Sequence, residues 1–496
     1  MKKILGISAG FHDGAVALID TNGEILFASH SERYSKVKND PGISPDMLAD
    51  ISQHDIDVVA YYERPFWHNM QRIISGQRPL GPWTLTGTLM YQLNDWYDRI
   101  LPQQYRSFPH HLSHAAAGFQ TSPFHEAAVV VIDAIGELDT ISIYRAWYDD
   151  QGRARYQRLW RQHYPHSIGL FYSAITKAVG LRPMDEEYIT MGMSAYGQAW
   201  RHQNQLMTSL LKDQQEITFA RNLHIGFDPG EFSSYDDTDV AAAAQSITEM
   251  LVNNVVSKTR RLVASDNLVY MGGVALNCVA NSRLGTIYDN IWIMPNPGDA
   301  GSSLGAAALA YGKKLNWNTA FLGHAIPGDY PVEALLRELE TRGIVGVASG
   351  AAEFGPRALG NRSLLADPRG PNIKDKVNDI KRRQKFRPFA PAILEEYCLD
   401  YFDMPRGWRD SRYMQVVADC RCPGLFPAVV HVDGTSRVQT VGPDGSGLRK
   451  LLEAWYLKTG CPMLLNTSLN IRGEPMVNDR DDADRFENLY GVQVHS

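Results

Sequence analysis

Residues 126–137 read EAAVVVIDAIGE, a short continuous apolar run that ends in acidic and glycine residues. Such a run is typical of a strand buried on both faces. A second run of this kind, at residues 267–277, reads NLVYMGGVALN. Each is followed by sequence able to enter a helix. We therefore expect an α/β fold in which the ends of these strands carry ligand-binding residues.

The chain begins with the pattern of a β-hairpin. KKILGIS at residues 2–8 and AVALID at 15–20 are short apolar runs, and TNGE at 21–24 joins the second run to ILFASH. An Asn-Gly pair between apolar runs favours a tight turn. Farther on, residues 298–312 read GDAGSSLGAAALAYG, a Gly/Ser-rich turn that opens an Ala-rich helix. Two explanations of this turn stay open: a phosphate site at the helix N-terminus, or close packing of the helix on a sheet.

The length of 496 residues predicts more than one domain. At residues 321–343 a Gly/Pro-containing loop leads into an amphipathic helix, and a new strand, IVGVASG, follows at 344–350. We place the boundary here and expect one unit at residues 1–330 and a second at residues 331–496. The sequence has no repeat of fixed period.

Three of the 15 histidines of the chain fall within HHLSH at residues 110–114. A helix brings positions i and i+4 onto one face, so His110 and His114 would face a common centre while His111 turns away. Two imidazoles suit a transition metal. The alternative, a hydrogen-bonded histidine cluster at a helix start, is equally compatible with this stretch alone.

Composition excludes several classes of protein. No apolar run approaches the roughly 18 residues that cross a bilayer, so we expect no membrane span. Five cysteines without a CxxC pair disfavour a disulfide scaffold or zinc ribbon and fit a reducing cytoplasm. A net charge of -6 supplies no general attraction to nucleic acid or anionic lipid.

The second unit repeatedly places arginine beside glycine, proline or asparagine. A guanidinium is a planar fork for phosphate or carboxylate, and the neighbouring residues fix loop geometry. A solvated basic face is the usual explanation of a charge cluster. It fits less well here, because FGPRALGNRS and NTSLNIRGEP are not helix-surface sequences. A multiply charged anion is therefore the expected partner of Arg357, Arg362, Arg383, Arg387, Arg437 and Arg472.

The chain resembles the ATP-dependent O-carbamoyltransferases of the nodulation-factor, tobramycin and cephamycin type. The resemblance covers nearly the whole chain, through ordered motifs that include GISAGFHDGAVAL, HHLSHAAAGF, VIDAIGE, GGVALNCVAN, PGDAGSSLGAA, EFGPRALGNRSLLADPR and LNTSLNIRGEP. It implies an N-terminal domain of the actin/hexokinase (ASKHA) type with bound iron and nucleotide. It also implies a C-terminal YrdC-like α/β domain that joins carbamoyl phosphate to ATP.

The resemblance assigns residues to these sites. The metal ligands, for iron or another divalent transition metal, fall on His110, His114, Asp133 and Asp299. The residues lining the nucleotide, ATP with Mg²⁺, fall on Gly272, Gly273, Asn277, Gly301 and Ser302. The C-terminal site for carbamoyl phosphate and ATP falls on Arg357, Arg362, Lys381, Arg383, Arg387, Arg437, Asn466, Asn470 and Arg472.

Three residues near the N-terminus are candidates for catalysis. We expect His12, with Asp13 beside it, to take the proton of the acceptor hydroxyl. The alternative is that both residues only shape the first phosphate turn. Lys38 resembles a family lysine at the acceptor site, although a lysine in such polar sequence is often simply exposed.

The chain departs from the family pattern at two positions. Ile189 stands where YKVMG-type sequences carry lysine, and Gln384 stands where an acidic residue is usual. Two rival functions remain: a tRNA threonylcarbamoyladenosine enzyme, and a non-catalytic ATP-binding sensor. The order of the two units and the EFGPRALGNRS block disfavour the first. The retained metal and arginine residues disfavour the second.

The acceptor hydroxyl belongs either to a small molecule or to a hydroxymethylated base such as 5-hydroxymethylcytosine. The region before HHLSH mixes aromatic and basic residues and would suit bases and phosphates through Trp67, Trp83, Trp96, Arg72 and Arg78. Alternatively, these aromatic residues form core or a homo-oligomer interface.

Overall fold

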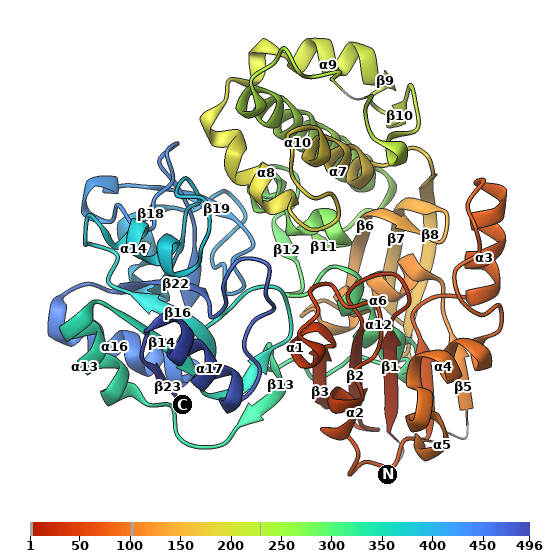
Figure 1. Ribbon diagram of the computed structural model, residues 1–496. Coiled ribbons are helices and arrows are strands. Elements are labelled where there is room, and N and C mark those ends of the chain that lie inside the picture. Colours follow the sequence, from red (N-terminus) through yellow and green to blue (C-terminus); the bar gives the residue numbers. More distant parts are fainter. Residues whose placement is uncertain (1–2, 101–103, 229) are drawn as a thin grey trace.

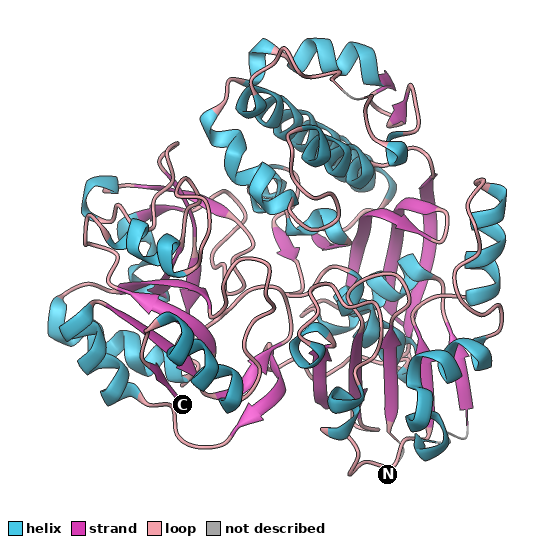
Figure 2. Cartoon of the chain, viewed as in Figure 1, coloured by secondary structure: helices cyan, strands magenta, loops and turns pink. Residues whose placement is uncertain are grey.

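The computed structural model describes residues 3–100, 104–228 and 230–496. It is a mixed α/β protein, as the sequence predicts, and its strands form several separate sheets (Figure 2). In Figure 1 an N-terminal sheet in red and orange, a helical layer in yellow and green, and a blue C-terminal part lie around a common centre. Within the described ranges, none of the helices combines the length and the apolar character needed to span a bilayer.

The first sheet has the strand order β3-β2-β1-β4-β5. Strands β1, β2 and β3 are antiparallel, whereas β4 and β5 run parallel to β1. The predicted hairpin is confirmed, and Gly23 adopts φ +84° in its turn, a conformation that favours glycine. The strands are β1 (Ile4–Ser8), β2 (Ala15–Ile19), β3 (Ile25–His30), β4 (Val58–Tyr61) and β5 (Gln104–Ser107).

The second sheet repeats the topology of the first. Its order is β12-β11-β6-β7-β8, with β7 antiparallel to β6 and to β8, and with β11 and β12 parallel to β6. This duplication gives no fixed-period repeat in sequence, because β6 has 11 residues where β1 has 5. The strands are β6 (Glu126–Gly136), β7 (Asp139–Tyr148), β8 (Ala154–His163), β11 (Asn267–Met271) and β12 (Asn290–Trp292).

The stretch 127–132 of strand β6 is apolar at every position because helices cover both faces of its sheet. Val129 and Val131 belong to the core shared with the first sheet, whereas Val130 and Ile132 belong to the core on the opposite face. Between the two sheets lie α6 and α12, and the outer face is covered by α7 and α10. These helices are α6 (His110–Thr121), α12 (Ser302–Tyr311), α7 (Ile168–Ala178) and α10 (Asp237–Leu262).

Smaller elements surround these layers. A helical segment with α3 and α4 stands beside the first sheet, and α8 and α9 pack near α10 (Figure 1). Their bounds are α1 (Glu32–Ser35), α2 (Pro45–Ala49), α3 (Pro65–Ile74), α4 (Leu85–Leu93), α5 (Tyr97–Ile100), α8 (Glu187–Met193), α9 (Gln203–Leu210), β9 (Leu211–Asp213), β10 (Thr218–Phe219) and α11 (Cys278–Asn281).

The C-terminal part has its own sheet and its own hydrophobic core, which includes Leu335, Val345 and Leu465. The strand order is β21-β17-β22-β16-β14-β23. The predicted amphipathic helix and the strand after it are confirmed as α13 (Val332–Arg342) and β14 (Ile344–Ala348). The other elements are β13 (Phe321–Ile326), β15 (Gly350–Glu353), β16 (Arg362–Ala366), α14 (Ile373–Ile380), β17 (Ala390–Leu394), α15 (Cys398–Tyr401), β18 (Phe402–Asp403), β19 (Val417–Cys420), β20 (Thr435–Arg437), β21 (Gln439–Val441), α16 (Gly447–Thr459), β22 (Met463–Ser468), α17 (Arg480–Tyr490) and β23 (Val494–His495).

Candidate active site

The structure brings His110, His114, Asp133 and Asp299 together in one buried cluster. One ligand atom from each residue lies within 4.8 Å of the others. The two histidines share a face in the first turns of α6. Asp133 lies near the C-terminal end of strand β6, and Asp299 lies just before α12. The His110 and His114 Nε2 atoms are 2.9 Å apart, and each lies 3.2–3.3 Å from an oxygen of both carboxylates.

Hydrogen bonds behind the two imidazoles fix which nitrogen faces the cluster. His110 Nδ1 lies 2.7 Å from Glu63 Oε1, and His114 Nδ1 lies 3.1 Å from the Pro297 carbonyl oxygen. We assign the Nδ1 proton of each ring to these acceptors, which leaves both Nε2 atoms with a free electron pair. Two imidazole nitrogens and two carboxylate oxygens then converge on one centre. Without a cation, burial lowers the pKa of His110 but Asp299 and Asp133 outweigh it and raise this pKa well above its usual value, so a bound metal would replace that proton. This donor set fits a divalent transition metal.

The third histidine of the motif is turned out of the cluster, as its helical position predicts. His111 is buried, and its Nδ1 lies 2.8 Å from Ser142 Oγ on β7. Gly136 packs directly against the ring of His110. A Cβ at this position would lie 2.4 Å from His110 Cδ2, so a larger residue would clash with the ring. His111 therefore packs α6 against β7, and the cluster uses the i, i+4 pair.

Electrostatics keep both aspartates ionised. Burial opposes their ionisation, but His110 and His114 outweigh it and hold the pKa of Asp133 well below its usual range. The pKa of Asp299 is lowered to about 2 against burial, mainly by the charge of His110. A metal ligand must be deprotonated, and this surrounding supplies two carboxylates in that state.

His12 faces the cluster from the turn between β1 and β2. Its Nε2 lies 3.6 Å from Asp299 Oδ2, and its Nδ1 lies 2.9 Å from Asp13 Oδ2. Burial lowers the pKa of His12, but the charges of Asp299 and Asp13 outweigh burial and raise this pKa to about 9. The predicted pair of His12 and Asp13 is therefore placed at the cluster. Lys38 is engaged by Glu32, with Nζ 3.0 Å from Oε2.

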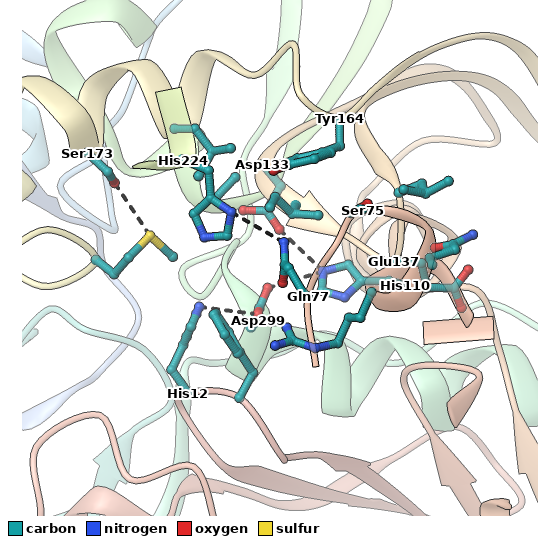
Figure 3. A pocket seen from close by; sticks show the side chains of 18 of the residues that line it. His12, Ser75, Gln77, His110, Asp133, Glu137, Tyr164, Ser173, His224 and Asp299 are labelled. Carbon is teal, nitrogen blue, oxygen red and sulfur yellow. Dashed lines mark hydrogen bonds and ion pairs between the residues drawn. The ribbon is translucent and has the colours of Figure 1, made fainter. Parts of the chain in front are cut away.

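His110, Asp133 and Asp299 of the cluster line a cavity of about 280 Å³ (Figure 3). The lining comes from the β1–β2 turn, the β6–β7 turn, α3, α7 and the loop near residue 224. His12, His110, Asp133 and Asp299 line the same space as Gln77, Tyr164 and His224. A substrate in this cavity would therefore reach three of the candidate metal ligands and His12 together.

The predicted nucleotide residues border the cluster on another side. The Gly273 backbone N–H donates to Asp133 Oδ1 at 3.1 Å, so Asp133 joins the cluster to the loop at residues 272–277. Gly272 adopts φ +93°, and a Cβ there would lie 2.2 Å from the Ile132 carbonyl oxygen. The Asn277 side chain caps the N-terminus of α11 and exchanges hydrogen bonds with Gln245.

The other two predicted nucleotide residues, Gly301 and Ser302, are buried at the start of α12. A Cβ on Gly301 would lie 1.8 Å from the Asn296 carbonyl oxygen. Close packing therefore accounts for small residues at this position.

Four of the predicted arginines form a half-buried group on the C-terminal part. Arg357 follows β15, Arg437 ends β20, and Arg383 and Arg387 lie between α14 and β17. Among the described residues, none of the four has a carboxylate oxygen within 4.0 Å. Burial and then the charge of Arg437 lower the pKa of Arg357 to about 9. Such uncompensated positive charge fits a polyanion.

The arginine group faces the N-terminal part. The Arg357 Nη2 atom lies 3.5 Å from the carbonyl oxygen of Leu276, and Arg387 lies over the ring of Tyr188 on α8 at 4.8 Å. The loop at residues 272–277 thus contacts Asp133 at one end and Arg357 at the other. One ligand lying along this loop would meet both the metal cluster and the arginine group.

Other predicted residues of the C-terminal site have structural contacts. Arg362 is fully buried and donates to the backbone carbonyls of five residues, which leaves no face for an anion. This corrects the expectation that all the motif arginines meet a ligand. Arg472 is paired with Glu186 at 2.8 Å. Lys381 Nζ donates to Ser468 and Asn470. Asn466 Nδ2 donates to the carbonyl oxygen of Ala358 at 3.1 Å, and Ala358 is the residue after Arg357.

Sequence reasoning missed Glu63 and His68. The Glu63 carboxylate lies between two imidazoles, with Oε1 2.7 Å from His110 Nδ1 and Oε2 3.1 Å from His68 Nδ1. The sequence does contain a signal for Glu63, because this acidic residue follows the apolar run of β4 in the same way that Asp133 follows the apolar run of β6.

The two departures from the family pattern lie at different kinds of position. The Ile189 side chain is only 1% exposed, so a lysine there would bury a charge. Gln384 has a buried Oε1 atom without a protein partner among the described residues.

We expect Glu63→Gln to weaken metal binding about ten- to a hundredfold, because the amide orients and polarises His110 less well than the carboxylate. Chelator competition measures this affinity. Glu137→Gln is the matched control, since Glu137 lines the same cavity but pairs with Arg64. Equal metal affinity in Glu63→Gln and the unaltered protein would show that Glu63 does not support the ligand.

Comparison with known proteins agrees with the family resemblance of the motifs. The profile of the carbamoyltransferase N-terminus matches residues 56–308, and that of the carbamoyltransferase C-terminus matches residues 336–494. An uncharacterized protein of Synechocystis sp. is 32% identical, over 98% of this chain and 94% of its own length. Nodulation protein NolNO of Sinorhizobium fredii is 29% identical, over 95% of this chain and 76% of its own length. These matches show that the chain belongs to the carbamoyltransferase family and is a transferase enzyme.

Proposed function

We propose that this carbamoyltransferase uses carbamoyl phosphate and ATP to carbamoylate a hydroxyl group through a carbamoyladenylate. The observation that carries the proposal is the loop at residues 272–277, which touches the metal cluster at Asp133 and the arginine group at Arg357. A nucleotide along this loop would have its reactive end near either site. This arrangement supports two half-reactions that share one intermediate.

The first half-reaction belongs to the arginine group. Carbamoyl phosphate and water give carbamate and phosphate, and a carbamate oxygen then attacks the α-phosphorus of ATP and displaces pyrophosphate. Arg357, Arg383, Arg387 and Arg437 would bind the phosphate groups and stabilise the charge that develops on them. The half-buried position of these side chains limits water, which would otherwise hydrolyse the intermediate.

The second half-reaction belongs to the metal cluster. His110, His114, Asp133 and Asp299 would hold the metal, and a bound divalent cation supplies Lewis-acid stabilisation of phosphate and carbamoyl oxygens. His12 takes the proton of the acceptor hydroxyl. Burial lowers the pKa of His12, and Asp299 is the first of the charges that raise it. If Asp299 held a cation, this charge would be neutralised, and we expect His12 then to act as a base.

We further propose that residues 1–330 form an actin/hexokinase-type unit and residues 331–496 a YrdC-like unit. The duplicated sheet with helices between its halves supports the first assignment, and the separate core of the C-terminal sheet supports the division. In this proposal Gly272, Gly273 and Asn277 border the nucleotide, and Lys38 takes no part in proton transfer because Glu32 engages it.

The first half-reaction is tested by exchange of labelled pyrophosphate into ATP. We expect exchange only when carbamoyl phosphate is present, because formation of the adenylate is reversible. Exchange that is equally fast without carbamoyl phosphate, or no exchange with it, would reject the carbamoyladenylate.

Salt dependence distinguishes a polymeric acceptor from a monomeric one. Of the aromatic residues predicted to stack on bases, Trp67 and Trp83 are exposed around Phe66, but Trp96 packs against the core under Arg99. We expect a monomeric acceptor in the cavity, and therefore a slope of log KM against log salt of about one or less. A hydroxymethylcytosine-containing DNA acceptor with a slope of several units would contradict this expectation.

A further inference from the structure

The cavity of the metal cluster runs from a buried end to an exposed end. His110, Asp133 and Asp299 are buried, whereas Lys177 and His224, which line the same cavity, are exposed. Between them the lining is mainly apolar, with Phe11, Tyr62, Ile135, Leu138, Leu170 and Leu223. A bound molecule would therefore have its reacting group at the buried end and an apolar body along these walls.

The carboxylates of the lining are already engaged. Glu63 lies between His68 and His110, Glu137 pairs with Arg64, and both aspartates belong to the cluster. They leave no negative charge free to balance a cation at the outer end. The cavity is therefore poorly suited to a polycationic acceptor.

Two cationic side chains of the lining are uncompensated. Lys177 lies at the exposed end, and the charge of half-buried Arg72 adds to burial in lowering the pKa of the neighbouring His224. Among the described residues, no carboxylate oxygen lies within 4.0 Å of Arg72 or Lys177. The Arg72 Nε–H donates to the Arg78 carbonyl oxygen at 2.8 Å, which orients the guanidinium. Its two terminal nitrogens have no hydrogen-bond partner within the described ranges. Both Arg72 and Lys177 line the cavity. A guanidinium held in this way is a fork for a carboxylate or phosphate.

We propose that the acceptor is an anionic hydroxyl compound whose carboxylate or phosphate is bound by Arg72 with help from Lys177. This inference rests on the proposed function, since it assigns the acceptor of the same transfer. The acceptor oxygen attacks the carbamoyl carbon of the adenylate, the bond from that carbon to the AMP oxygen breaks, and the hydroxyl proton passes to His12. The anionic group is unchanged and serves only to hold the acceptor.

Two acceptor pairs test this inference and separate the two sources of anion. Hydroxymethylbenzoate is compared with its neutral amide, and hydroxymethyldeoxycytidine monophosphate with its nucleoside. For the carboxylate, the phosphate or both, we expect the anionic member to have a kcat/KM about ten- to a hundredfold above that of its neutral partner. Mass spectrometry measures the gain of one carbamoyl group.

Arg72→Gln identifies the residue responsible. We expect it to remove the preference for the anionic acceptor, mainly through a higher KM, and to leave the neutral acceptor unchanged. Arg78→Gln is the matched control, because it removes a neighbouring guanidinium but keeps the backbone carbonyl that orients Arg72. Lys177→Gln should reduce the preference by a smaller factor, since a lysine offers no fork.

The inference is overturned if neutral acceptors react as well as the anionic ones, if no anionic acceptor of either pair reacts, or if Arg72→Gln slows both members equally. Pyrophosphate exchange, which needs no acceptor, is measured on the same samples. Its persistence in these cases would leave the first half-reaction standing and reject only the acceptor class. Its absence from the unaltered enzyme would reject the proposed function itself.

Discussion

The double variant His110→Ala, His114→Ala is expected not to bind a metal ion and to lose at least about a thousandfold of the carbamoyl-transfer rate. Two of the four ligand atoms disappear, and the remaining carboxylates no longer complete the donor set. The rate falls because a metal ion supplies several kcal/mol of stabilisation to developing charge. Metal analysis and a transfer assay measure the two effects, and circular dichroism checks the fold.

His111→Asn is the matched control for this variant. It removes an imidazole from the same helix and leaves the His110–His114 pair in place, so metal should remain. If the alanine variant unfolds because Asp133 and Asp299 are left buried and unpaired, His114→Gln keeps most of the volume and a polar partner. Stoichiometric metal in the folded His114→Gln or double-alanine protein would contradict the assigned ligands.

Arg437→Ala is expected to slow carbamoyl-phosphate-dependent pyrophosphate exchange by about 1.5–3 kcal/mol, roughly ten- to a hundredfold. Arg437 Nε is buried and has no protein partner among the described residues, as expected of a side chain that binds a ligand. Because its charge adds to burial in lowering the pKa of Arg357 and of Arg383, its removal also relieves repulsion, and Tm should not fall. Exchange kinetics and thermal unfolding test both statements.

Arg421→Ala provides the comparison, because Arg421 is an exposed arginine of the same region that pairs with Asp403. Its exchange rate should stay near that of the unaltered enzyme. Full exchange in Arg437→Ala, accompanied by a fall in Tm, would instead assign Arg437 a structural role like that of Arg362.

Local sequence pattern predicts those parts of the fold that depend on neighbouring residues. The run at Val129–Ile132 predicts a strand covered on both faces, and the Asn-Gly turn predicts the hairpin of β2 and β3. The duplication of the sheet is invisible, because it is a relation between strand orders and not between residues. The duplication is recognised only by comparing the two strand orders, in which β1 and β6 each have an antiparallel neighbour on one side and a parallel neighbour on the other.

The candidate site shows the same limit. The spacing of His110 and His114 predicts one face of a helix, and the family resemblance adds Asp133 and Asp299. The residue pattern alone does not join two aspartates so far apart in the chain, and the fold shows one ligand atom of each residue within 4.8 Å of the others. Motif chemistry cannot separate Arg437 from Arg362, since both are arginines in loop-like sequence. Their difference comes from residues distant in sequence. The carbonyl oxygens of His324 and Asn478 accept from Arg362, whereas Arg437 Nε has no such partner in the part of the chain that the structure describes.

The central claim, carbamoyl transfer through an adenylate, is tested most directly by counting AMP against carbamoylated acceptor in a single reaction. The account predicts one AMP released for each acceptor carbamoylated, and no product when ATP is omitted. Product formed from carbamoyl phosphate without ATP, or without AMP, would contradict it.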